Sequence, residues 1–387
     1  MANTLTISAF AENLYSARDI VARELTGFIP SVLINSAEDG VSINGTVTSV
    51  VTAQPTLNTT ATPAMTIPDG DDQTMTALTT SIAQVANVRI PMVGEVWKKL
   101  NNTAGSKIAL DYLLAQGLRV IVNAIETHCG TVIKNGSSRA YGTAGTTPFA
   151  STHAAIPQVH QILKDNGAPE DGQISLVINT SAGTNLRSLT NLYKVNEAGS
   201  DALVRRGTLL DIDGLMIKES AGVASHVKGA GTGTLFNGAG AVGATSLVYD
   251  TMTVNTTGIK AGDVITHASD STNKYIVGTG ATAASGTLII NNPGLKVAAL
   301  DNDAITVGAN YTGNVAFHRN AVELFVRPPA LPEGGDAAID SLTISDSKTG
   351  LVFQVSIYGG YKMQMLDITT YYQAKVWKPE FVATLLG

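Results

Sequence analysis

"GSKIALDYLLAQGLRVIVNAIETHCGTVI", Gly105–Ile133, is the stretch that decides the fold. Its apolar side chains recur every three or four residues, from Leu110 through Ile121 to Ile133, which is the spacing of one face of an α-helix. We predict a helix over Ser106–Ile133, about 42 Å long at about 1.5 Å per residue. A helix of this length suits a spine or strut within a larger body.

The segment before this helix has a different composition. Residues 41–86 are rich in Thr and Val, and the alternation in Gly45–Val51 and Met75–Ile82 predicts two long strands. "PDGDDQ", Pro68–Gln73, lies between them and is typical of a turn. Because so polar a hairpin cannot make a core of its own, it needs something outside itself to pack on. Farther upstream, Ser8 is expected to cap an amphipathic helix that stops at Gly27.

The segment after the long helix alternates between helix and strand signals up to residue 228. Pro157 is expected to open a short helix and "ISLVINT" to form a strand. Ser181 is expected to cap a second helix, "SAGTNLRSLTNLY", which runs to Tyr193. From Gly229 to about Tyr311, short apolar runs bounded by Gly, Asn or Asp predict a small all-β barrel or sandwich of about 80 residues. Charged residues and long strand patterns follow, so this β block is predicted to be an insertion within a larger α/β domain.

The composition bounds the class of protein. Of 387 residues, 14% are charged and 44% hydrophobic, and the net charge is −6. The charged fraction is well below the roughly 25% of an ordinary globular domain, which favours extended β structure and large subunit contacts. The mild acidity argues against a nucleic-acid-binding face. The single cysteine excludes an internal disulfide framework and a cysteine-based zinc site.

The amino-terminal sequence has no basic region followed by an apolar run, so no signal peptide is expected. No stretch approaches the roughly 18 uninterrupted apolar residues of a membrane span. We therefore expect a soluble chain that is made inside the cell and has no membrane partner.

"GAGAVG", Gly238–Gly243, matches the dinucleotide-binding pattern G-x-G-x-x-G, and Asp263 follows at the distance of a ribose-binding acid. The pyrophosphate of a dinucleotide needs a helix after the glycines, and "ATSLVYDTMTV" predicts a strand there instead. We interpret the motif as the flexible seam where the chain passes into the inserted β block, and we expect no cofactor.

Four further candidate sites are each better explained without a catalytic or metal-binding role. Cys129 and His128 are adjacent on one helix, so they diverge by about 100° and cannot act as nucleophile and base. His153 and His160 are separated by Pro157, and no metal-binding histidine pair is present. Two acidic runs, "DIDG" at Asp211–Gly214 and "DGDD" at 69–72, are better explained as a turn and a solvated loop than as acid–base or Ca²⁺ sites. We expect neither catalytic nor metal-binding residues, and hence no enzyme.

The order of these segments resembles the major capsid proteins of tailed bacteriophages, an α+β class with the Hong Kong 97-like fold. The subgroup with an inserted β domain, as in the Salmonella podovirus coat protein, fits best. The long helix resembles the family's spine helix, and "LVRRGTLLDIDGLMIKES" resembles the axial domain before its insertion. "GTLFNGAGAVGATSLVYDTMTV" resembles the start of the inserted domain, and "NVAFHRNAVELFVRPPALP" with "DITTYYQAKVWKPEFVATLLG" resembles the carboxyl-terminal segment.

The resemblance implies an order of parts along the chain. These are 1–40, an N-terminal arm; 41–90, an extended β-hairpin loop; 91–149, a peripheral domain with the spine helix; 150–228, the first part of an axial domain; 229–310, the inserted barrel-like β domain; and 311–387, the carboxyl-terminal part of the axial and peripheral domains.

The resemblance also implies a function: self-assembly as pentamers and hexamers into an icosahedral shell around double-stranded DNA. Its partners would be copies of itself, a scaffolding protein, a portal and DNA bound only non-specifically, with assembly in the host cytoplasm and a final place in the virion. Some relatives fuse a lysine of the extended loop to an asparagine of another subunit, but the first lysine here is Lys98, so no covalent crosslinks are expected. The chain starts at the arm, which leads us to expect a separate scaffolding protein.

Electrostatics suggests one inter-subunit contact. The acidic tip of the extended loop, Asp69, Asp71 and Asp72, is expected to dock on a basic group of a neighbour, with Arg205 and Arg206 as the most concentrated candidates. Two other functions stay open at this point. A secreted adhesin or surface-layer protein would fit the Thr, Asn and Gly richness, and a nicotinamide-dependent oxidoreductase rests on Gly238–Gly243 alone.

Overall fold

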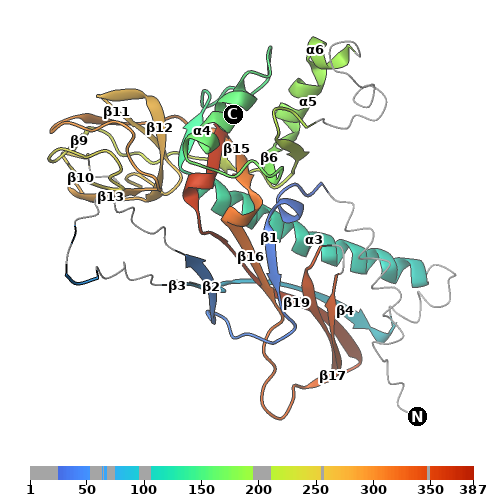
Figure 1. Ribbon diagram of the computed structural model, residues 1–387. Coiled ribbons are helices and arrows are strands. Elements are labelled where there is room, and N and C mark those ends of the chain that lie inside the picture. The colour runs from blue at the N-terminus through green and yellow to red at the C-terminus, as the bar shows by residue number, and fades with distance from the viewer. Residues whose placement is uncertain are drawn as a thin grey trace.

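This computed structural model describes residues 25–52, 63, 65–67, 75–95, 106–194, 211–253, 257–346 and 349–387. The predicted long helix is confirmed as α3 (Ser106–Asn135), which extends two residues beyond the predicted end. Its length, about 45 Å at about 1.5 Å per residue, spans the body of the molecule (Figure 1). The predicted helix after Ser8 and the predicted turn at Pro68–Gln73 lie outside the described residues.

A six-stranded sheet packs against α3. Its strand order is β1-β16-β19-β18-β17, with β4 paired to β19 as well. The strands are β1 (Leu33–Ser36), β4 (Gln84–Val93), β16 (Val322–Arg327), β17 (Ala338–Ser345), β18 (Val352–Gly360) and β19 (Met363–Val376). Buried side chains of α3, including Leu114, Ile121 and Ile125, join those of this sheet in one hydrophobic core.

A second sheet begins beyond the carboxyl end of α3 and runs into the inserted block. Its twelve strands follow the order β11-β14-β9-β10-β13-β12-β5-β20-β15-β6-β7, and β8 pairs with β15. Those of the body are β5 (Arg139–Tyr141), β6 (Ile174–Ile178), β7 (Met216–Glu219), β8 (Ser225–His226), β15 (Tyr311–His318) and β20 (Val382–Leu386). A separate core lies between this part of the sheet and the helices α4 (Ala155–Asp165) and α5 (Thr180–Ser188).

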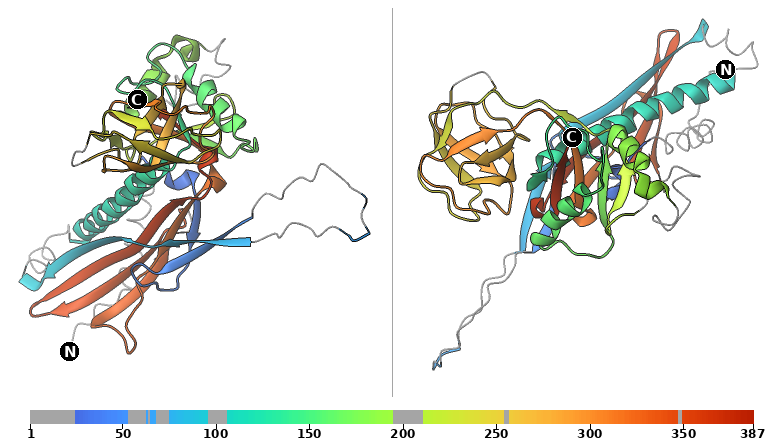
Figure 2. Two further views of the ribbon diagram at one scale, coloured as in Figure 1. Left: turned by 90° about the vertical axis from the view of Figure 1, so that its left-hand side faces the viewer. Right: turned by 90° about the horizontal axis from the view of Figure 1, so that it is seen from above.

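The inserted block is a closed barrel, which confirms the all-β prediction. Its strands are β9 (Thr234–Phe236), β10 (Ser246–Asp250), β11 (Val264–His267), β12 (Asp270–Thr279), β13 (Gly286–Ile290) and β14 (Ala304–Val307). The first and last strands of the series pair with each other, since β11 pairs with both β12 and β14. The barrel has its own core, with Tyr249, Tyr275 and Leu288 among its buried side chains, and lies to one side of the body (Figure 2).

Two predictions about the second helix are wrong. The residue that caps α5 is Asn179, whose side-chain oxygen accepts from the Ala182 N–H, and Ser181 lies inside the helix. The Asn179 N–H donates in turn to the Asn314 side chain at 2.8 Å, so a tertiary contact selects the cap. The predicted single helix is also split, because Leu189 is extended and separates α5 from the short α6 (Thr190–Tyr193).

The predicted hairpin is present as β2 (Thr46–Thr52) and β3 (Met75–Ser81), in antiparallel register from Thr46 opposite Ser81 to Thr52 opposite Met75. Within the described residues these two strands pair only with each other. None of the described side chains on these strands is buried; they alternate between half-buried and exposed. The hairpin leaves the body where Ile82 is fully buried, and Figure 2 shows β2 and β3 pointing away from the rest of the chain.

Candidate functional site

The five residues predicted for the inter-subunit contact, Asp69, Asp71, Asp72, Arg205 and Arg206, lie outside the described residues. Met65 and Ile67 are among the described residues near the hairpin tip, and the relative exposures of these two residues are 106% and 93%. Two large apolar side chains are therefore held fully in water. The alternation Met-Thr-Ile between two prolines could have indicated an exposed apolar contact from the sequence. The prediction was based on the neighbouring acidic run instead.

The glycine motif has neither the geometry of a dinucleotide site nor that of a domain seam. Gly238–Gly243 is the loop between strands β9 and β10 of the barrel, so no helix follows it. Its backbone is held by the barrel: the Gly240 N–H donates to the Ala299 carbonyl at 2.9 Å, and the Gly243 N–H to the Leu295 carbonyl at 2.7 Å. The interpretation of this motif as the passage into the inserted block is therefore wrong.

The actual passage between body and barrel is at His226 and Tyr311, which pair across β8 and β15. A buried polar chain, the barrel junction, fills it. Lys134, at the end of α3, places its Nζ 3.1 Å from Nδ1 of His226, and Nε2 of His226 lies 2.7 Å from Oδ1 of Asp263. Because an ammonium group only donates, Nδ1 of His226 accepts from it and Nε2–H donates to Asp263.

Asp263 is fully buried and satisfied on both oxygens. Besides His226, it accepts from the Gly229 N–H at 3.0 Å and from the Lys260 N–H at 2.8 Å. Gly229 fits only because it lacks a side chain, since a Cβ there would lie 2.1 Å from the Gly258 carbonyl oxygen. Asp263, which the sequence motif suggested as a ribose ligand, therefore connects the start of the barrel to the body through these hydrogen bonds.

Tyr311 closes the other side of the barrel junction. Its hydroxyl donates to the Gly262 carbonyl at 2.6 Å, and its ring lies 5.1 Å from that of His226 and 5.7 Å from Lys134 Nζ. Burial raises the pKa of the Tyr311 hydroxyl, with a further contribution from Asp263, so the group remains a donor. Burial lowers the pKa of Lys134 to about 8, against the opposing attraction of Asp263.

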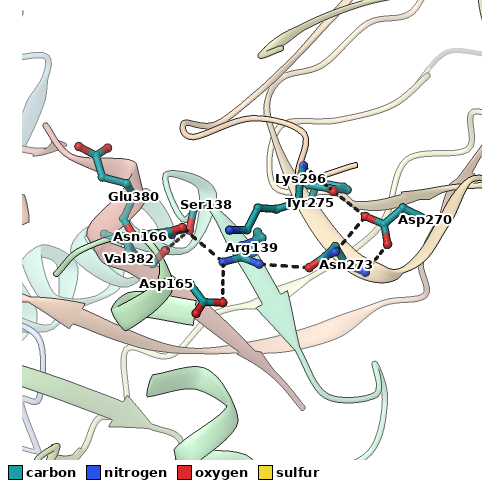
Figure 3. A network of polar contacts seen from close by, with 10 residues as sticks. All are labelled: Ser138, Arg139, Asp165, Asn166, Asp270, Asn273, Tyr275, Lys296, Glu380 and Val382. Atoms are coloured by element: carbon teal, nitrogen blue, oxygen red, sulfur yellow. Dashed lines mark hydrogen bonds and ion pairs between the residues drawn. The ribbon is translucent and has the colours of Figure 1, made fainter. Parts of the chain in front are cut away.

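A second polar network joins the barrel to the body around Arg139 of β5 (Figure 3). Nη1 of Arg139 donates to Oδ1 of Asn273 in the barrel at 3.1 Å, and Nη2 donates to Oδ1 of Asn166 in the body at 3.3 Å. On the barrel side, the Tyr275 hydroxyl donates to Asp270 at 2.7 Å. Burial and this hydrogen bond raise the pKa of Tyr275 to about 12.

Backbone pairing adds to these contacts. β12 pairs with β5, with Lys274 opposite Ala140 and Tyr275 opposite Arg139, so the barrel sheet continues into the body sheet. The Asn291 side chain donates to the carbonyls of Asn135 and Ser137, both at 2.8 Å, just beyond the end of α3. The barrel is therefore attached by side chains and by a strand ladder, and not by a flexible linker alone.

A third buried group, Glu126 of α3, holds the start of the described chain. Its carboxylate accepts from the Gly27, Phe28 and Ile29 N–H groups at 2.6, 2.7 and 3.0 Å. It also accepts from the Ser220 hydroxyl at 2.6 Å. We call this the arm clamp, because it fixes residues 27–29 against the middle of α3 and against the segment after β7.

Four buried histidines, which the sequence presents as scattered, each face one aspartate from another segment. The pairs are His160–Asp213 at 3.0 Å, His226–Asp263 at 2.7 Å, His267–Asp303 at 3.5 Å and His318–Asp171 at 3.0 Å. Asp213 is the second acid of the "DIDG" run and lies in a turn with φ +54°, which agrees with the turn interpretation. These pairs are structural staples between segments.

The remaining candidates are placed as follows. Cys129 is fully buried, and burial followed by the nearby Glu126 charge raises the pKa of its thiol. His128 packs edge-on against Tyr372 at 5.4 Å between ring centres. His153 precedes α4 and His160 lies within it, so the two do not share one helix. The prediction that Pro157 opens this helix is wrong, because α4 begins two residues earlier, at Ala155. In the described ranges, no three His, Cys, Asp or Glu side chains gather as metal ligands would, and no helix is long and apolar enough to cross a membrane.

No protein-family model and no curated protein matches this chain. Several solved structures do. The capsid structure of the cyanophage P-SCSP1u is 10% identical, with coverage of 94% of this chain and 88% of that chain and a TM-score of 0.49. The mature capsid of bacteriophage PhiM1 is 12% identical, with coverage of 93% and 86% and a TM-score of 0.47. A chain of Mycobacterium phage Che8 is 13% identical, with coverage of 88% and 84% and a TM-score of 0.46.

All three are structures of phages.

The arm clamp leads to a first prediction. Glu126→Gln replaces an acceptor oxygen by an amide group that faces backbone donors, so the free energy of unfolding should fall by about 2–3 kcal/mol. Ser220→Ala removes one donor and keeps the carboxylate, and should cost only about 1 kcal/mol. Urea unfolding followed by circular dichroism measures both. Equal losses in the two variants would contradict a clamp centred on the charge.

The barrel junction leads to a pH prediction. Folding lowers the pKa of Lys134 from 10.5 to about 8, so between these values the unfolded chain binds a proton that the folded chain does not. Stability should therefore rise with pH in this window relative to Lys134→Met, which has no titrating group there. Urea midpoints of the wild-type chain and this variant, measured from pH 7 to 10.5, give the difference. The Lys134→Arg variant stays charged throughout this range, so the stability of the wild-type chain should also rise with pH relative to this variant. A difference in urea midpoint that does not change with pH would refute the lowered pKa of Lys134.

Proposed function

We propose that this chain is the major capsid protein of a tailed bacteriophage, with the Hong Kong 97-like fold and an inserted β domain. It assembles as pentamers and hexamers into an icosahedral shell around double-stranded DNA. A separate scaffolding protein directs assembly in the host cytoplasm, a portal occupies one vertex, and DNA is contacted without sequence specificity. The shell is held without covalent crosslinks, because the extended loop, residues 41–90, contains no lysine that could form one; the first lysine of the sequence is Lys98.

The observation that carries the proposal is the β2–β3 hairpin. Its described strand residues include no buried side chain, it pairs with no other described strand, and Met65 and Ile67 near its tip are fully exposed. An isolated two-stranded hairpin is marginal in water, so it needs contacts from outside itself. A neighbouring copy that covers the hairpin supplies the missing contacts.

The rest of the architecture supports the same function. A helix of 30 residues packed on a six-stranded sheet makes a stiff plate, suited to tiling. The barrel is joined to strand β5 of the twelve-stranded sheet by a strand ladder and to the end of α3 by the buried polar groups of the barrel junction, which supports a fixed position beside the plate. The low charged fraction, 14%, agrees with large contacts between copies.

The decisive test is electron microscopy of the chain co-expressed with its scaffolding protein. We expect closed icosahedral shells, and on a denaturing gel of mature shells a single band at the 40.1 kDa of one chain. Monodisperse monomers under all conditions would refute the capsid assignment. A ladder of covalent multimers would refute only the absence of crosslinks.

The hairpin tip separates two kinds of contact. Met65→Ser with Ile67→Ser should lower the yield of shells by about tenfold, because two exposed apolar groups lose their partner surface. Asp71→Ala with Asp72→Ala should lower the yield less, since exposed ion pairs contribute only about 0.2–1 kcal/mol each. Thr66→Ser is the matched control. Thermal midpoints of the unassembled variants should equal that of the wild-type chain, and unchanged yields would exclude the tip as a contact.

A further inference from the structure

Among the described strands, β17 pairs with β18 alone and so forms one outer edge of the six-stranded sheet (Figure 1). Natural proteins protect such edges with short strands, prolines or charged side chains, above all lysine, because unpaired backbone groups attract other chains. The other outer strands of the two large sheets follow this rule: β1 and β7 have four residues each, and β4 contains Pro91. β17 has eight residues, with neither proline, lysine nor arginine.

The two faces of β17 differ. Past a bulge between Ala338 and Asp340, the strand pairs regularly with β18, from Asp340 opposite Ile357 to Ser345 opposite Val352. Ile344 is buried in the main core, and Leu342, two residues before it on the same face, is 37% exposed. Ser341 and Thr343 lie on the opposite face, because side chains alternate along a strand. Leu342 thus extends the core toward the edge of the sheet without being covered.

We propose that β17 pairs antiparallel with β17 of a second copy about a two-fold axis at Leu342, so that the sheets of two subunits become continuous. This inference rests on the proposed function, since it assigns one contact between subunits of the shell. The proposed partner is a second copy of the same strand. The proposal rests on a long edge strand whose only charged residue, Asp340, lies beside the bulge at its start, and whose remaining residues can pair with themselves.

Faces and charges restrict the register, and the cover of the exposed Leu342 selects among the registers that remain. A two-fold axis keeps each side chain on its own face only when the residue numbers of opposing positions add to an even sum. With Leu342 opposite Leu342, Ser341 faces Thr343 and Asp340 faces Ile344, so two half-exposed leucines cover each other and no like charges oppose. A shift by one position on each strand, to Thr343 opposite Thr343, would place Asp340 opposite Asp346. Like charges directly opposite destabilise a strand pair.

Disulfide trapping tests the register. Opposed Cα atoms in antiparallel strands are about 4.5–5.5 Å apart, within the range that a disulfide bridges. Leu342→Cys in the full-length chain, assembled and then oxidised, should give a covalent dimer on a non-reducing gel. The single native cysteine, Cys129, is buried and contributes no background. Thr343→Cys is the matched control and should stay monomeric, whereas Ser341→Cys combined with Thr343→Cys should restore the dimer.

A charge substitution tests the contribution to assembly. Leu342→Lys places two ammonium groups opposite each other on the axis and should lower the yield of shells about tenfold. Thr343→Ser, on the other face and opposite a serine, adds no charge to the edge and should leave the yield unchanged. Thermal midpoints of the unassembled variants confirm that each still folds, since Leu342 is already partly exposed.

The outcomes separate this inference from the proposed function. Closed shells in which Leu342→Cys stays monomeric would overturn the β17 pairing and leave the capsid assignment intact, as expected if a neighbour's β2–β3 hairpin covers this edge instead. A Leu342→Cys dimer without shells under any condition would support the pairing and count against the capsid assignment.

Discussion

The burial of α3 is the constraint on which the other elements depend. One face of this helix supplies the main core, from Leu114 to Ile133, and its carboxyl end provides Lys134 to the barrel junction. Because the helix is about 45 Å long, both large sheets and the barrel take their positions from it. Glu126 uses the same helix to fix the start of the described chain, so one element organises three otherwise separate regions.

Polar groups inside this molecule are concentrated where separate parts meet. The barrel junction, the arm clamp and the network around Arg139 each join segments that are distant in sequence, and each is almost fully satisfied by hydrogen bonds. Apolar packing alone tolerates small slides, whereas a buried carboxylate with three or four donors allows one placement. A plate that must meet identical neighbours benefits from such fixed geometry, because an error in one subunit is repeated across the contact.

The parts of the fold that were predictable are those written in local pattern. The 3.6-residue period of apolar side chains predicted α3, and the alternation of apolar and polar residues predicted the β2–β3 hairpin. Short apolar runs between glycines predicted the barrel strands. The buried histidine–aspartate pairs could not be predicted because the two partners are far apart in the sequence. His160 and Asp213 are separated by 53 residues, and His318 and Asp171 by 147. The cap of α5 was wrongly predicted as Ser181 because the contact that holds Asn179 in the capping position comes from Asn314, which lies on a distant strand. The glycine motif misled because its meaning depends on the following element, here a barrel strand.

The chain enters the inserted block and leaves it at directly paired residues, His226 and Tyr311. The ends of the insert are thus separated by no more than the spacing of two neighbouring strands, about 4.8 Å. A loop closed at its base in this way can lengthen, shorten or be exchanged with little strain on the strands that carry it, since loop-closure entropy grows only slowly with length. The parts of the barrel that face away from β5 are therefore a region where evolution can vary size and surface while the plate keeps its shape.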